Sequence, residues 1–187
     1  NTKVSVTVYR YSEGRSIDFE MVRKRIKIVN ATSEILPGNI GYIRLIMFDS
    51  DIAEYFEEHL KNLLSQNIKG LVIDVRDNPG GSYDQVIKIA DRILPKGLIV
   101  YTEDKNKKKK EEMSDARSID LPIAVLINEN SASASEILAG AIKDHNRGVL
   151  VGTKTFGKGL VQVLLPLGDG SGLKVTVARY FTPSGVC

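Results

Sequence analysis

Two short segments near the C-terminal end of the chain hold residues that could do nucleophilic chemistry. The first, residues 130–136, places Ser133 where an apolar strand gives way to a helix. The second, residues 152–159, holds Lys158 in a glycine-flanked loop, 25 residues after Ser133. A serine hydroxyl becomes a nucleophile when a neighbouring base takes its proton, and a lysine can be that base once burial lowers its pKa. The two residue types therefore indicate covalent serine catalysis, provided that the fold brings them together.

Ser133 also fits a purely structural role. With Glu136 it forms a capping-box pattern, in which the serine oxygen accepts a backbone N–H at the start of a helix. A helix start also presents free N–H groups, so the N–H of Ala134 could hold an oxyanion formed at Ser133. Ser131 and Ser135 are rival nucleophiles, and only geometry can separate them from Ser133.

A second turn, residues 77–81, interrupts another apolar run with the sequence Asp-Asn-Pro-Gly-Gly. At its simplest this is a chain reversal, because proline and glycine are the usual residues of turns. Two glycines also leave backbone N–H groups unshielded, so a substrate carbonyl can approach closely. Gly80 or Gly81 is therefore a candidate donor to an oxyanion.

Other chemistries fit the sequence poorly. Residues 152–158 match G-x-x-x-x-G-K, but Gly159 stands where a phosphate-binding loop needs Ser or Thr, and a β-like run follows instead of a helix. His145 lies on the helix that begins at Ser133, about 18 Å further along its axis, which is too far for direct proton transfer. Cys, His and acidic residues show no metal-ligand spacing, so no metal or organic cofactor is expected.

The composition is that of an ordinary globular protein with room for one core and a small appendage: 187 residues, 42% hydrophobic, 26% charged and a net charge of +3. Lysines 107–110 are flanked by acidic residues and contain no aromatic residues, which predicts a solvated loop and no nucleic-acid partner. No apolar run reaches the roughly 20 residues that cross a bilayer, so we expect membrane association only through a segment preceding this chain. Cys187 allows no internal disulfide.

Apolar periodicity predicts a β-hairpin with a half-buried face over residues 4–21, and from Gly38 onward strands that alternate with helices. Such alternation implies a largely parallel sheet, in which the turns after strand C-termini bind ligands. We therefore expect the turns at 77–81 and 128–133 to face one cleft. The expected strands cover residues 42–48, 70–75, 99–102, 121–127, 149–151, 160–165 and 173–180.

Four ordered motifs, at residues 70–81, 131–141, 151–162 and 178–185, resemble those of the carboxyl-terminal processing peptidases, or tail-specific proteases. These are serine peptidases with a Ser–Lys dyad, and the resemblance runs from about residue 1 to 185. It implies an α/β fold with a crotonase-like, ClpP-like protease core, a mixed and largely parallel sheet and flanking helices. The core would cover residues 28–187 and be truncated at its C-terminal end. Residues 1–27, too short for a core of their own, would be the trailing strands of a PDZ domain.

The resemblance also implies roles for individual residues. Ser133 would be the nucleophile and Lys158 the general base. Gln162 would orient the lysine, and Asp144 matches an aspartate that supports activity in some members. The oxyanion hole would combine the N–H of Ala134 with that of Gly80 or Gly81.

The function implied is that of a serine endopeptidase that cleaves protein substrates near their C-termini through an acyl-enzyme. The alternative is a peptide-binding module that has lost turnover. Substrates would bind in extended form along a sheet edge, with residues 160–165 and the Gly80–Gly81 turn lining the groove. The expected location is outside the cytoplasm, in a bacterial periplasm or cell envelope or in a plastid lumen. The oligomeric state is left open.

Overall fold

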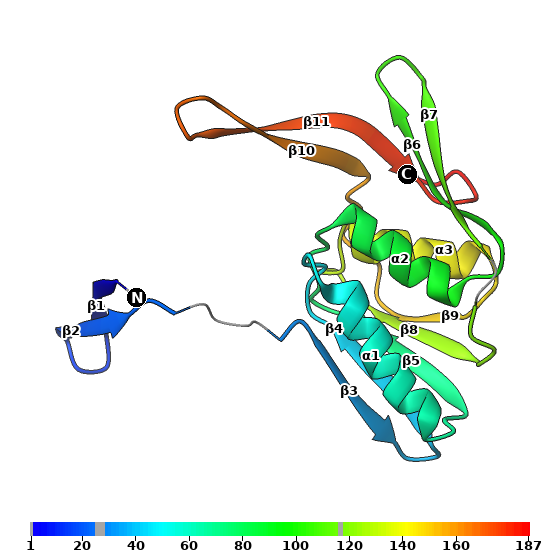
Figure 1. Cartoon of the computed structure of the whole chain (residues 1–187), viewed down its shortest axis with the longest axis horizontal. Coiled ribbons are helices and arrows are strands. Elements are labelled where there is room, and N and C mark those ends of the chain that lie inside the picture. Colours follow the sequence, from blue (N-terminus) through cyan, green and yellow to red (C-terminus); the bar gives the residue numbers. More distant parts are fainter. Residues whose placement is uncertain (1, 25–28, 116–117) are drawn as a thin grey trace.

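A five-stranded sheet forms the body of the protein (Figure 1), in a computed structural model that describes residues 2–24, 29–115 and 118–187. Its strand order is β3-β4-β5-β8-β9. The first pair is antiparallel, and the other three pairs are parallel. The mixed α/β class with a largely parallel sheet is therefore confirmed. The strands are β3 (Ala31–Leu36), β4 (Ile40–Leu45), β5 (Gly70–Asp74), β8 (Ile123–Ile127) and β9 (Val149–Gly152).

Apolar side chains in register hold the middle of this sheet. Ile43 pairs with Ile73, and Ile73 pairs with Val125, and all three are fully buried. The helix α1 (Ile52–Ser65) buries an apolar stripe of Ile52, Phe56, Leu60 and Leu63. It packs against α2 (Tyr83–Ile93), which packs in turn against α3 (Ala134–Asp144). The three helices cover the sheet and leave the carboxyl ends of its strands for loops.

A second sheet is antiparallel throughout, with the order β10-β11-β6-β7. It consists of two hairpins that extend from the body in Figure 1. The strand expected at residues 99–102 is longer than predicted. It extends to Asp104 because it pairs as a hairpin with β7, which follows a tight turn. The lysine run is therefore only partly a loop: Lys109 and Lys110 begin β7, with their side chains exposed. The strands are β6 (Gly97–Asp104), β7 (Lys109–Ser114), β10 (Leu160–Pro166) and β11 (Gly172–Phe181).

The predicted N-terminal hairpin is present as β1 (Lys3–Arg10) and β2 (Arg15–Val22), which form a separate two-stranded sheet. Of the predicted half-buried face, Val4 and Ile17 are partly buried, whereas Val8, Phe19 and Met21 are 41–47% exposed. Alternation alone does not say what covers an apolar face. The expected domain boundary between residues 27 and 28 lies outside the described residues, and the PDZ assignment remains a prediction.

Candidate active site

Two loops at the carboxyl end of the parallel sheet are joined by hydrogen bonds. The N–H of Asp77 donates to Asn128 Oδ1 (2.9 Å), and the Asp77 carboxylate accepts from the side-chain amides of Asn128 and Asn130 (2.8 Å each). The N–H of Ala132 donates to the carbonyl oxygen of Asn78 (3.0 Å). Because β5 and β8 are parallel neighbours, the turns that follow them lie side by side, as the alternation of strands and helices predicted.

Ser133 occupies a strained position between β8 and α3. Its backbone has φ 56° and ψ −113°, a region that costs a non-glycine residue about 1–3 kcal/mol. Its N–H donates to Glu136 Oε2 (2.8 Å), which supplies the glutamate half of the predicted capping box. The N–H of Glu136 donates to the Ser133 carbonyl oxygen (2.9 Å); the Ser133 side chain faces this N–H, as the predicted capping box requires, but makes no side-chain cap hydrogen bond. The strained turn therefore presents the serine without using its hydroxyl to start the helix.

The rival serines have other functions. The hydroxyl of Ser131 donates to the carbonyl oxygen of Val75 (2.7 Å), and the hydroxyl of Ser135 donates to the backbone carbonyl oxygen of Asn78 (3.0 Å). Both side chains are fully buried, whereas Ser133 is half-buried. Geometry thus separates Ser133 from its neighbours, which the sequence could not do.

The loop after β9 carries Lys158, and two side chains fasten it to the Ser133 turn. The Glu136 carboxylate accepts the backbone N–H groups of Gly157 (2.7 Å) and Lys158 (2.9 Å) in addition to that of Ser133. The Tyr180 hydroxyl, from β11, donates to the Lys158 carbonyl oxygen and lies 3.2 Å from the Ser133 carbonyl oxygen. Burial, aided by the charge of Glu136, raises the pKa of Tyr180, so this phenol remains a donor.

Six of the seven expected site residues line a single cavity of about 480 Å³. Ser133 Oγ and Lys158 Nζ are not hydrogen-bonded to each other, and such contacts often tighten only when substrate binds. The Gln162 side-chain amide donates a long hydrogen bond to Thr176 Oγ1 (3.4 Å), and no hydrogen bond joins Gln162 to Lys158. The six residues are Ser133, Ala134, Lys158, Gln162, Gly80 and Gly81.

The two glycines differ in the state of their N–H groups. The N–H of Gly80 donates to Asn78 Oδ1 (2.9 Å), whereas neither Gly81 nor Ala134 has an N–H acceptor among the described residues. Gly80 instead packs tightly, since a Cβ added there would lie 2.8 Å from Ser133 Cβ and 2.9 Å from Ala134 N. The free backbone donors beside Ser133 are therefore those of Gly81 and Ala134.

Asp144 lies at the opposite end of α3, about 16 Å along the helix axis from Ser133. Its carboxylate accepts the N–H of Ser184 (2.9 Å). Burial opposes ionisation here, but hydrogen bonds from Thr182 and Ser184 outweigh it and lower the pKa of Asp144. The structure thus places Asp144 as an anchor for the turn after β11 and does not bring it to the nucleophile.

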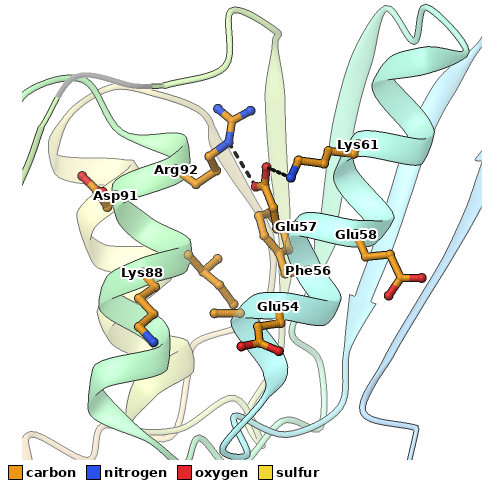
Figure 2. Close-up of a pocket in the computed structure, with 10 residues that line it drawn as sticks. Glu54, Phe56, Glu57, Glu58, Lys61, Lys88, Asp91 and Arg92 are labelled. Carbon is orange, nitrogen blue, oxygen red and sulfur yellow. Dashed lines mark hydrogen bonds and ion pairs between the residues drawn. The ribbon is translucent and has the colours of Figure 1, made fainter.

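A larger hollow of about 850 Å³ lies between α1 and α2 (Figure 2) and shares no residue with the Ser133 cavity. Its central carboxylate, Glu57, pairs with Arg92 (3.1 Å) and Lys61 (3.5 Å), as Figure 2 shows. These charges neutralise one another within the protein. Among the residues that the structure describes, no group of His, Cys, Asp or Glu is arranged to hold a metal ion, and no helix is long and apolar enough to cross a membrane.

Glu136 and Tyr180 are the site residues that sequence reasoning missed. The sequence pattern predicts Glu136 only as part of a helix cap, and it includes Tyr180 only as a member of a motif. The sequence marks both residues only by their positions inside the motifs at 131–141 and 178–185. Which loops they join depends on the fold.

Comparisons with known proteins show the family to which this chain belongs. A carboxy-terminal-processing protease of Bartonella bacilliformis is 43% identical over 98% of this chain, and a carboxyl-terminal-processing protease of Synechocystis is 40% identical over the same share. The chain spans 44% of the length of each relative. Among solved structures, a photosystem II D1 C-terminal processing protease matches 99% of the chain and 52% of its own, with a TM-score of 0.76 and 35% identity. Residues 39–187 match the sequence profile of peptidase family S41. The chain therefore belongs to peptidase family S41.

Proposed function

We propose that this protein is a serine endopeptidase that cleaves protein chains near their C-termini through an acyl-enzyme. The observation that carries the proposal is that Ser133, alone among the three serines of its turn, lines a cavity together with Lys158. The names of the relatives, carboxyl-terminal processing proteases, support the substrate class.

The reaction begins when Ser133 Oγ attacks the scissile carbonyl carbon and the neutral amine of Lys158 takes the hydroxyl proton. The N–H groups of Ala134 and Gly81 receive the oxyanion of the tetrahedral intermediate; loss of one such donor typically costs about 2.7–4 kcal/mol. Lys158 then passes its proton to the leaving amine as the peptide C–N bond breaks. A water molecule, deprotonated by Lys158, hydrolyses the ester and restores Ser133. Gln162 orients the lysine in this proposal.

Substrate binds in extended form beside β10, which is an edge strand of its sheet, so that main-chain hydrogen bonds supply affinity. We also propose a location outside the cytoplasm or in a plastid lumen, supported by relatives from a cyanobacterium and by a chloroplastic peptidase of Tetradesmus obliquus, which is 41% identical over 83% of this chain.

The test is cleavage of casein by the wild type, Ser133→Ala and Lys158→Arg. Arginine keeps the charge but does not deprotonate, so both variants should be inactive while remaining folded. Residual cleavage by Ser133→Ala equal to that of the wild type would refute the nucleophile assignment.

A further inference from the structure

The cavity that contains Ser133 is lined by basic side chains and by no acidic ones. Its lining includes two lysines, Lys158 and Lys174, and no aspartate or glutamate. Lys158 has a role in the proposed reaction, but Lys174 has none. Lys174 is exposed and, like most lysines among the described residues, has no ion-pair partner; only Lys3, Lys61, Lys107 and Lys110 pair with a glutamate. The cavity that contains the reaction centre therefore has an unpaired ammonium group in its wall.

The register of the β10–β11 hairpin places Lys174 on the face that carries Gln162. Gln162 pairs with Thr176, and Leu164 pairs with Lys174, so all four residues point to the same side. Lys174 is thus a diagonal neighbour of Gln162, about 7–8 Å away between their α-carbons. Since Gln162 also lines the cavity, this face of the hairpin forms a wall of the substrate site.

The position of Lys174 along β11 indicates how far its side chain lies from the turn that carries Ser133. Tyr180, whose hydroxyl lies 3.2 Å from the Ser133 carbonyl oxygen, is six residues further along the same strand. Six strand residues span about 20 Å, and an extended substrate covers that span in a similar number of residues. Because the lysine side chain is long and flexible, a group that it binds would lie about four to six residues from the scissile bond.

We propose that Lys174 forms a carboxylate-binding subsite, which selects substrates carrying an anionic group about four to six residues from the cleaved bond. The inference rests on the proposed peptidase function and names a determinant of its substrate class. Two sources supply the same chemistry: the terminal carboxylate of the substrate chain and the side chain of an aspartate or glutamate.

The experiment uses quenched fluorescent peptides that share one cleavage sequence and differ in the neutral tail after it. One series ends in a free acid, a second in an amide, and a third is amidated with one aspartate at varied positions. For the wild type we expect kcat/KM to favour the acid over the amide by about two- to fivefold, most strongly at tails of about four to six residues and less at high salt. Selectivity for the first series identifies a chain terminus, and selectivity for the third an acidic side chain.

Lys174→Met should bring the acid-to-amide ratio to one, and Lys174→Glu should reverse it. The matched control is Lys88→Met, which removes an exposed lysine that lines the α1–α2 hollow shown in Figure 2 and should keep the wild-type ratio. A ratio that persists in Lys174→Met, or a wild type that prefers neither anionic series, overturns the proposal.

Failure of the peptidase proposal can be told apart from failure of this one. If the wild type cleaves no peptide, the same peptides are measured as ligands of Ser133→Ala by fluorescence anisotropy. An acid-over-amide preference that disappears in Ser133→Ala combined with Lys174→Met supports the carboxylate subsite without turnover. Equal binding of acid, aspartate and amide peptides rules it out.

Discussion

The carboxylate of Glu136 accepts the backbone N–H of Lys158 at 2.9 Å, with the same oxygen that accepts the N–H of Ser133 at 2.8 Å. One oxygen atom thereby fixes the separation of the two segments that carry the proposed nucleophile and base. Glu136, in the first turn of α3, is one of the two side chains that hold these segments together, and Tyr180 is the other.

Glu136→Gln should therefore impair catalysis more than folding. An amide has one oxygen, so its NH₂ group must face at least one of the three backbone N–H donors. Hydrogen bonds to a charged group contribute about 1.5–3 kcal/mol, which corresponds to a tenfold to hundredfold loss of kcat/KM. Steady-state kinetics on one peptide, with the circular dichroism spectrum as a check of folding, measures this. A fully active Glu136→Gln would show that the shared oxygen does not set the site geometry.

Tyr180→Phe should lower kcat with little change in KM, because its hydroxyl contacts the backbone of both segments but no group expected to bind substrate. The lost hydrogen bond should also reduce the free energy of unfolding by about 0.5–1.5 kcal/mol. Tyr11→Phe is the matched control, since Tyr11 is 89% exposed on the N-terminal hairpin. If Tyr180→Phe changes only the free energy of unfolding, Tyr180 has a structural role alone.

Alanine substitutions should separate the three serines of the turn. Ser133→Ala should be folded and inactive. Ser131→Ala and Ser135→Ala should instead lose stability, because each removes a buried hydrogen bond to a backbone carbonyl oxygen, at a cost of about 0.5–1.5 kcal/mol. Urea unfolding and activity are measured together. Cleavage that disappears only in Ser131→Ala or only in Ser135→Ala, with unfolding unchanged, would assign the nucleophile differently.

The buried carboxylate of Asp74 predicts a pH-dependent stability. Burial alone would raise its pKa, but hydrogen bonds from Arg76 and Tyr42 outweigh burial and lower the pKa. A lowered folded-state pKa means that the stabilisation is present above the unfolded value of about 3.9 and is lost as pH falls through the folded value. Asp74→Asn should thus cost about 1–3 kcal/mol at pH 7, and the difference from wild type should shrink below about pH 4.

Urea unfolding of both proteins across this pH range checks the prediction. Asp51→Asn is the control, because Asp51 is exposed at the start of α1 and makes no side-chain cap hydrogen bond. A deficit of Asp74→Asn that stays constant with pH would contradict the assigned cause.

Periodicity and turn residues predicted the parallel core well, because α1 and the strands β5 and β8 carry continuous apolar patterns that local physics determines. The antiparallel strand β3 was missed, since residues 31–36 mix Thr, Ser and Glu with apolar residues and become a strand only by pairing with β4. The choice among the three serines depended on the φ angle of Ser133. The contacts of Tyr180 depended on how β11 crosses the site, which no local pattern encodes.

The most direct test of the account is to trap the acyl-enzyme and locate it. Wild-type protein mixed with an ester or peptide substrate and quenched in acid within milliseconds should gain the mass of the acyl fragment, and peptide mapping should place that mass on Ser133. The adduct should be absent from Ser133→Ala and Lys158→Arg, and a chelator should leave its yield unchanged. An adduct on another residue would contradict the proposal that Ser133 is the nucleophile. So would a wild type that cleaves substrate but forms no adduct.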